Sequence, residues 1–175
     1  MHQTVIEMNL PEPNTTNSSF EDEAELRDLL LFSTGGRVFA VSTGDAEGTA
    51  ESQQPAPLPL APAPILGVVY ARGRMLTLID PVALITGEAS ESPTVVPAII
   101  SLRGDEQLSL AADAIGETIT VSSTDISSPR DDHQPEPNTA VAGILRYAGE
   151  TITVLDSSRL FHAAVQRRER RRRRL

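Results

Sequence analysis

Three aspartates, Asp80, Asp113 and Asp156, stand near the ends of predicted strands, where paired carboxylates could act as a general acid and base. Such catalysis would require two of them in a shared pocket with shifted pKa values. A helix cap or a turn explains Asp80 and Asp156 more directly, because each follows an apolar strand and precedes a short apolar-spaced stretch. We therefore predict that the protein is not an enzyme.

Other residue types that bind metals or perform catalysis are scarce. The three histidines, His2, His133 and His162, lie in separate regions of the chain, and nothing predicts that they meet. The chain has no cysteine, which excludes disulfides, thiolate zinc sites and thiol catalysis. It also has no lysine, so it cannot contain a P-loop lysine. We expect no metal, no cofactor and no small-molecule substrate.

The charged residues divide the chain into an acidic body and a basic tail. Residues 167–175 contain seven arginines and one glutamate, a charge of +6, whereas the rest of the chain holds eight arginines and 23 acids, a charge of −15. A body this acidic repels nucleic acid, so only the tail could bind it. Three interpretations of the tail remain: a solvated terminus, a site for acidic partners, or a site for nucleic acid or anionic lipid.

No membrane span is expected, because no stretch approaches ~20 apolar residues. The N-terminus also lacks a basic segment followed by an apolar one, and we expect a cytoplasmic protein without membrane insertion. Residues 1–26 carry six acids and no lysine or arginine, a composition that predicts disorder.

A repeat with a spacing of 76 residues indicates the architecture. Residues 65–80 and 141–156 each read as an apolar strand, a turn ending in glycine, a second apolar strand and an aspartate. The strands that precede the two copies, at residues 29–41 and 98–110, correspond loosely. Five pairs are identical: Gly67 and Gly143, Gly73 and Gly149, Thr77 and Thr153, Asp80 and Asp156, Leu84 and Leu160. Two similar β units in tandem are the simplest interpretation.

Elements outside the repeat are predicted from local signals. Pro81 suits the first turn of a short helix that ends near Thr86. A final helix has Leu160, Phe161, Ala164 and Val165 on one side. Residues 42–54 are polar and small, with neither alternation nor an apolar run, and predict a loop that is the least ordered internal segment of the first half.

The run from Ile65 to Asp80 resembles the signature of the CheW-like domain of bacterial chemotaxis adaptors. In that family a proline-flanked segment leads into a strand of the type Ile-x-Gly-Val-x-Asn-Leu-Arg-Gly, then an apolar strand and Asp-Leu. The matching residues are Pro59 to Pro64, Ile65, Gly67, Val68, Arg72, Gly73, Ile79 and Asp80. Downstream, residues 110–115 and 143–156 resemble later motifs of the family, and the match covers about residues 29–162.

The resemblance implies a mostly β fold of two tandem five-stranded SH3-like barrels with a short C-terminal helix. We expect the barrels at about 27–86 and 94–156 and the helix at about 157–166, which together make a CheW-like domain at 27–166. An acidic tail at 1–26 and an Arg-rich tail at 167–175 flank this domain.

The family also implies a function. Its members are non-enzymatic scaffolds that couple a chemoreceptor signalling tip to a CheA-type histidine kinase through protein contacts. The alternative is a small β-barrel protein that binds nucleic acid or another anionic partner through the tail. Nucleic acid is the weaker expectation, because the strands lack the basic residues and stacking aromatics that such barrels present.

The chain departs from the family pattern at several positions. Tyr70 stands where asparagine is usual, Thr77 replaces a proline and Pro81 replaces a leucine. The largest departure is at residues 42–54, where the family has a strand of the type Val-x-x-Val-x-Glu-Ile. Glu47 matches its glutamate, but a glycine follows in place of the apolar residue.

Five residues are candidates for partner binding: Arg72, Gly67, Gly73, Arg74 and Glu47. The resemblance makes Arg72 the receptor-contacting arginine, and the plain alternative is a solvated turn arginine beside Arg74. Gly67 and Gly73 are expected to serve the backbone, through close strand approach and positive φ, and to affect the partner surface indirectly. Glu47 is a candidate only if its segment forms a strand.

Overall fold

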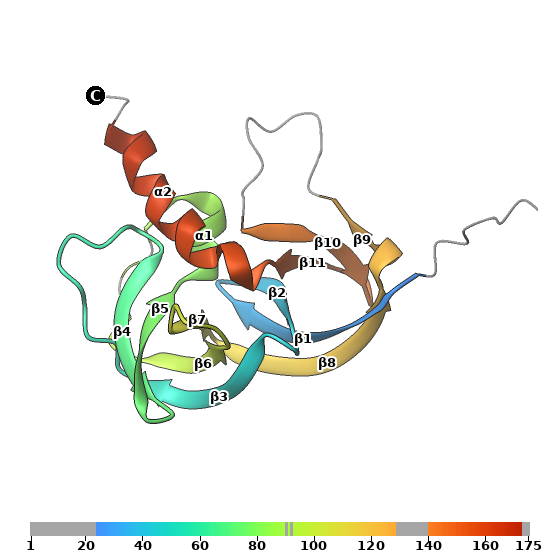
Figure 1. The fold of residues 1–175 in the computed structure, drawn as a ribbon, viewed down its shortest axis with the longest axis horizontal. Helices are drawn as coiled ribbons and strands as arrows, with labels where there is room; N and C mark the ends of the chain where they lie inside the picture. Colours follow the sequence, from blue (N-terminus) through green and yellow to red (C-terminus); the bar gives the residue numbers. More distant parts are fainter. Residues whose placement is uncertain (1–23, 90, 92, 129–139, 173–175) are drawn as a thin grey trace, which may run out of the picture.

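The computed structural model describes residues 24–89, 91, 93–128 and 140–172, with side chains as far as residue 166. Eleven strands, two α-helices and two short 3₁₀ helices form within this part of the chain (Figure 1). The strands are β1 (Leu26–Thr34), β2 (Arg37–Ser42), β3 (Ala46–Gln53), β4 (Ile65–Ala71), β5 (Arg74–Ile79), β6 (Val96–Leu102), β7 (Leu108–Ala112), β8 (Ala114–Ser122), β9 (Ile126–Ser127), β10 (Val141–Tyr147) and β11 (Glu150–Leu155). The helices are α1 (Pro81–Thr86), η1 (Ser123–Asp125), η2 (Ser157–Arg159) and α2 (Leu160–Arg172).

The strands form two curled sheets that lie side by side (Figure 1). The order is β8-β1-β2-β11-β10-β9 in the first sheet and β3-β6-β7-β5-β4 in the second. The two orders correspond strand by strand, apart from the extra β9. Each sheet contains one parallel pair, β2 with β11 and β7 with β5, and its other pairs are antiparallel. This confirms the expected mostly β fold with two barrel-like halves and a short C-terminal helix.

The two sheets do not follow the barrel boundaries expected at 27–86 and 94–156. The first sheet combines β1 and β2 with β8 to β11, and the second combines β6 and β7 with β3 to β5. The first hairpin of each repeat unit therefore belongs to the sheet that contains the remaining strands of the other unit. The boundaries at 27–86 and 94–156 are those of the two repeat units, which sequence similarity defines. The sheets are defined by strand pairing, and each one contains strands of both units.

The repeat is confirmed at the level of single residue pairs. In β4 and β5 the pairing runs from Ile65 with Ile79 to Ala71 with Arg74, with a bulge before Gly67. In β10 and β11 every partner lies 76 residues later, and the bulge falls before Gly143. Because the register is the same throughout, the two hairpins are copies of one structure.

A segment that follows the third strand of each unit closes each sheet. After β3 the chain returns to β4 through an isolated antiparallel bridge between Ala56 and Val68, with hydrogen bonds of 2.8 and 2.9 Å between their main chains. After β8 the chain continues through η1 into β9, where Ser127 pairs with Ile144. The two bridges occupy equivalent places, since Ile144 is the repeat counterpart of Val68.

Three hydrophobic clusters hold this arrangement together. One cluster fills the first sheet, another fills the second, and the largest lies between them under the two helices. Phe32 and Phe39 belong to the largest cluster and stack across β1 and β2 with ring centroids 5.6 Å apart. Alternate residues of β1, β2, β6 and β7 face the central cluster and a sheet interior, so the exchanged hairpins are buried on both faces.

The predicted loop at residues 42–54 is wrong. Ala46–Gln53 form β3, which pairs antiparallel with β6 from Ala46 with Leu102 to Gln53 with Val96. Two alanines of this strand, Ala46 and Ala50, pack against hydrophobic clusters, and its other residues are polar or glycine, so its composition has no strand pattern. The apolar strand β6 supplies the pairing, and long-range contacts override local propensity in this way.

Two helices, α1 and the η2 turn that leads into α2, begin where an aspartate was predicted to cap. The Asp80 carboxylate accepts a hydrogen bond from the main-chain N–H of Val82 at 2.8 Å, and α1 ends at Gly87 with a φ of 78°. The Asp156 carboxylate accepts from the N–H of Ser158 at 3.1 Å and starts η2. These contacts confirm the capping interpretation of the two repeated aspartates.

The expected apolar side of the final helix needs a correction. Leu160 and Ala164 are fully buried, but Phe161 and Val165 are 42 % and 41 % exposed. Ala163, which was not expected there, is buried in their place. Leu160, Ala163 and Ala164 share one face of α2, because helix neighbours recur at three and four residues, and this face covers the central cluster. Neither described helix is long and apolar enough to cross a membrane.

Candidate functional site

Arg72 lies in the turn that joins β4 to β5. The turn has two central residues, Arg72 and Gly73, with φ values of 54° and 78°. Two positive φ angles in a two-residue hairpin are the mark of a type I′ turn, whose twist matches that of the flanking strands. Ala148 and Gly149 repeat it in the second copy, at 49° and 81°. The turn therefore requires this backbone conformation but not the arginine, because alanine stands at the same position of the second copy.

Glu47 and Arg74 meet at this hairpin. The Arg74 guanidinium forms an ion pair with the Glu47 carboxylate, and it also donates to the main-chain oxygen of Leu102 at 3.3 Å. Both side chains are 31 % exposed. Because of a bulge between Ala46 and Gly48, Glu47 has no pairing partner in β6. Its side chain is directed to the ion pair with Arg74 instead.

Arg72 lies against Gly48, the residue after Glu47. A Cβ built on Gly48 would lie 2.9 Å from the guanidinium carbon of Arg72, a separation that real Cβ atoms essentially never show. The missing side chain thus makes room for the guanidinium over the β3 backbone. Arg72 is exposed, and within the described part of the chain it has no carboxylate within ion-pair distance.

The two candidate glycines lie at different places. Gly73 is in the turn, where no atom comes within 4 Å of a built Cβ, so its positive φ alone explains the residue. Gly67 lies at the other end of β4, where a built Cβ would lie 2.9 Å from the carbonyl carbon of Ala56. Gly67 therefore permits closure of the sheet. Of the five candidates, the structure brings together Glu47, Arg72, Gly73 and Arg74, and it places Gly67 at the far end of the strand.

Sequence reasoning missed the role of Gly48. The signal was present, because glycine replaces an apolar residue directly after Glu47, in a segment that contains Gly44 as well. Its meaning required the position of Arg72, which is 24 residues later in the chain. The ion pair of Arg74 with Glu47 could not be predicted either, because the sequence did not show that residues 46–53 form a strand beside the hairpin.

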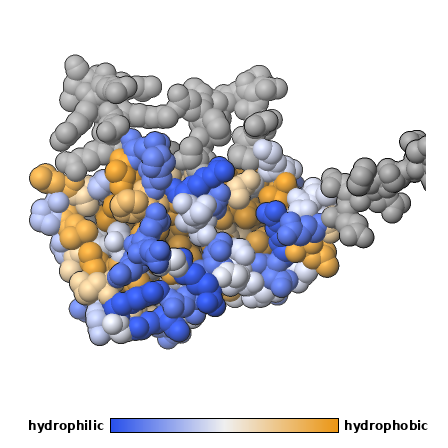
Figure 2. All heavy atoms as spheres, in the orientation of Figure 1, coloured by the Kyte–Doolittle hydropathy of each residue, from blue (hydrophilic) through white to orange (hydrophobic). Residues whose placement is uncertain are grey.

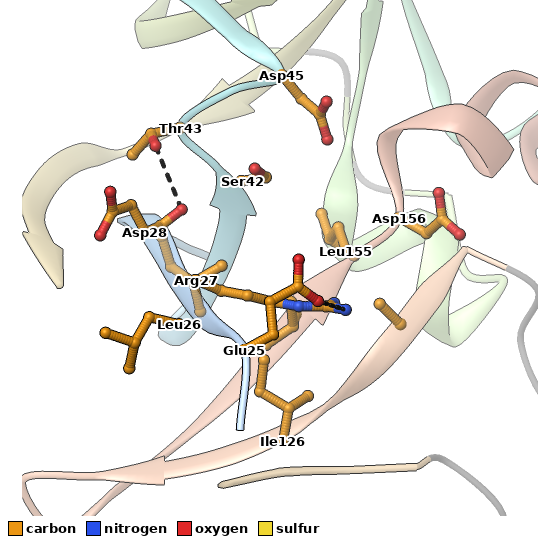
Figure 3. A pocket seen from close by; sticks show the side chains of 13 residues that line it. Glu25, Leu26, Arg27, Asp28, Ser42, Thr43, Asp45, Ile126, Leu155 and Asp156 are labelled. Carbon is orange, nitrogen blue, oxygen red and sulfur yellow. Dashed lines mark hydrogen bonds and ion pairs between the residues drawn. The ribbon is translucent and has the colours of Figure 1, made fainter. Parts of the chain in front are cut away.

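A cleft of about 490 Å³ lies at one end of the strands of the first sheet, between the start of β1, the end of β2, the start of β10 and the end of β11 (Figure 3). Its charged lining is mainly acidic: Glu25, Asp28, Asp45 and Asp156, with Arg27 as the cation. Each of these groups has a partner in the protein. Arg27 pairs with Glu25 at 3.4 Å, Thr120 donates to Asp28 at 2.5 Å, Ser157 donates to Asp45 at 2.7 Å, and Arg159 pairs with Asp156 at 3.0 Å.

The third predicted carboxylate, Asp113, accepts a hydrogen bond from the main-chain N–H of Gly35 at 2.8 Å. It therefore ties the β1–β2 turn to the end of β7. In the described residues, no group of three histidines or carboxylates is placed to hold a metal ion. The arginine side chains of residues 167–175, His2 and His133 lie outside the part that is described.

Comparisons with known proteins agree on one family. Residues 28–165 match the family model described as the CheW-like domain. The chain is similar to a protein named chemotaxis protein CheW from Rhizobium meliloti (strain 1021), with 29 % identity over 136 residues, 77 % of this chain and 87 % of the relative. Its fold is similar to the crystal structure of the scaffolding protein TtCheW from Thermoanaerobacter tengcongensis, with a TM-score of 0.64 and 19 % identity over 81 % of this chain and 91 % of that chain.

Proposed function

The chain belongs to the CheW-like domain family, and from this premise we propose that it is a non-enzymatic adaptor that couples a chemoreceptor signalling tip to a CheA-type histidine kinase. Protein contacts alone would carry this function. The names of the relatives, a chemotaxis protein and a scaffolding protein, support it at the level of the pathway.

One observation supports Arg72 as the receptor-contacting residue. Of the two arginines in the β4–β5 hairpin turn, Arg74 is neutralised by Glu47, whereas Arg72 is exposed without an ion pair among the described residues. Its guanidinium lies against Gly48, where a side chain would otherwise stand. An exposed arginine at this position can offer a planar fork to a carboxylate of a partner, which lysine cannot reproduce.

The remaining candidates support this residue rather than contact the receptor. Glu47 removes the competing charge of Arg74 and fixes the start of β3 beside the turn. Gly73 allows the type I′ turn that carries Arg72, and Gly67 allows the closing segment to cross β4. Loss of any of these three would weaken receptor binding through the position of Arg72.

The test compares Arg72→Asp with Ala148→Asp. Ala148 occupies the same position of the same turn in the second copy and has nearly the same φ, so both variants place an aspartate in an equivalent backbone. Each should fold, since an exposed turn residue seldom changes the free energy of unfolding by more than ~0.5 kcal/mol. Thermal unfolding of both variants checks this.

Binding is then measured to the cytoplasmic signalling fragment of a chemoreceptor and to a CheA-type kinase from the same organism. Arg72→Asp should weaken receptor binding by roughly 2 kcal/mol, on the order of 30-fold, as expected for an interface hot spot. Ala148→Asp should bind the receptor as the wild type does, and both variants should bind the kinase. If both variants bind the receptor equally well, the role of Arg72 is wrong; if the wild type binds neither protein, the adaptor function is wrong.

A further inference from the structure

The outer face of the β4–β5 hairpin carries two exposed apolar residues next to Arg72. Tyr70 and Met75 are direct cross-strand partners, and they are 68 % and 55 % exposed. Their chain neighbours Ala71 and Leu76 are 6 % and 0 % exposed and point into the sheet. The exposed pair is therefore the outward side of a well-packed hairpin and not a sign of poor packing.

The second copy of the hairpin has polar residues at the positions of the exposed apolar pair. Arg146 and Thr151 stand at the positions of Tyr70 and Met75, in the same register. The buried positions keep their apolar character, with Leu76 matched by Ile152 and Leu78 by Val154. The two hairpins have one backbone and similar interiors, so folding does not require the exposed tyrosine and methionine.

The exposed residues of the first copy have the composition of a protein interface. Tyrosine, methionine and arginine are enriched in interfaces, and hot spots are enriched in tryptophan, tyrosine and arginine. Figure 2 shows hydrophobic residues on both sides of a hydrophilic middle, and one of these sides is where β4 and the loop before it lie. Arg72, which has no ion pair among the described residues, adds a cation beside Tyr70 and Met75 to a body whose charge is −15.

We propose that Tyr70 and Met75 form, with Arg72, one docking surface for a receptor segment that presents an apolar side chain beside a carboxylate. The carboxylate pairs with Arg72, and the apolar side chain packs on the tyrosine ring and the methionine thioether. Charge complementarity supports this occupant, because a cation on an acidic body attracts a carboxylate. The inference rests on the proposed function and names the residues that decide which receptor segment the adaptor accepts.

The test replaces the face of the first hairpin with that of the second. In Tyr70→Arg with Met75→Thr, each new residue already occupies the equivalent position of the other copy, so the fold should be kept. A second variant, Tyr70→Thr with Met75→Thr, removes the same apolar surface without adding a positive charge. The matched control places the apolar pair on the other copy, as Arg146→Tyr with Thr151→Met.

The probe is the cytoplasmic signalling fragment of a chemoreceptor from the same organism, titrated against the full chain by isothermal calorimetry. Both hairpin variants should weaken binding about tenfold or more, as truncation of an interface hot spot does, and the control should bind as the wild type does. Receptor binding equal to wild type in both hairpin variants, while Arg72→Asp loses it, would overturn the docking surface and leave the proposed function standing. A wild-type chain that does not bind the fragment overturns both.

Discussion

Gly67 and Gly143, at equivalent positions of the two copies of the repeat, each leave room for a neighbouring backbone segment that a side chain would obstruct. Each stands directly after the bulge in the first strand of its hairpin. A Cβ on Gly67 would lie 2.9 Å from the carbonyl carbon of Ala56, and one on Gly143 would lie 2.7 Å from the carbonyl oxygen of Ser127. Ala56 and Ser127 belong to the segments that close the two sheets, so the repeated glycine marks the closure of each one.

Alanine at either glycine should therefore destabilise the protein. Gly143→Ala should cost about 1–3 kcal/mol, the usual range for a side chain forced into occupied space. Gly67→Ala should cost about 1–3 kcal/mol more, because its φ of 145° adds backbone strain. Urea unfolding measures both. Gly44→Ala is the control, since its Cβ would make only an ordinary contact of 3.5 Å with Ser42; equal stability of all three variants would contradict the steric account.

Alanine at Gly48 should disturb Arg72 and leave the fold intact. The atoms that a Cβ would meet belong to the end of a flexible arginine, which can move away. The free energy of unfolding should change by less than about 1 kcal/mol. Receptor binding should fall several-fold, because the guanidinium loses its position over the β3 backbone. The NMR signal of the Arg72 Nε–H group should shift as well, and an unchanged signal with unchanged binding would show that Gly48 does not hold the arginine.

The ion pair of Glu47 and Arg74 should contribute a small, salt-dependent coupling energy. A double-mutant cycle with Glu47→Gln and Arg74→Gln should give about 0.5–1 kcal/mol, the range for pairs that water still reaches. The coupling should shrink between 0.05 and 0.5 M salt, values chosen to span about a threefold change in screening length. Chemical denaturation of the four proteins at both salt concentrations tests this, and zero coupling at low salt would mean that the pair adds nothing to stability.

Hydrogen exchange should show that β3 is an ordered strand. In an antiparallel pair, alternate residues of one strand bond to its neighbour, so every second amide of Ala46–Gln53 should exchange slowly through its bond to β6. The intervening amides should exchange faster, because they face away from that partner. Uniformly fast exchange across the segment would show that it is a loop, as its composition predicts, and not a strand.

Deletion of residues 167–175 should hardly change the stability of the domain. Among the side chains that the structure describes, those that anchor α2 are Leu160, Ala163 and Ala164, all of which precede the deletion. We expect the melting temperature to move by only a degree or two. Leu160→Ala is the contrast, with an expected loss of about 2–5 kcal/mol for a fully buried leucine. A large loss on deletion would mean that the tail itself binds the acidic body.

Local features of this protein could be read from the sequence. The hairpins of the repeat, their glycine turns and the aspartate caps depend on residues only a few positions apart, and all of them form as expected. Apolar runs separated by glycine turns predicted the strands of both copies, because a strand in a sheet must bury at least one face. The family resemblance then supplied the fold class, which the two corresponding sheets confirm.

Only the tertiary structure decided how the strands pair and which residues meet. The polar segment Ala46–Gln53 becomes a strand because β6 lies beside it, and the first hairpins are exchanged because β3 and β8 pair with the hairpin of the other unit. The contacts of Arg72 with Gly48 and of Arg74 with Glu47 follow from that pairing. Such contacts join residues more than 20 positions apart, and their energy comes from packing between elements, which no local pattern of residues encodes.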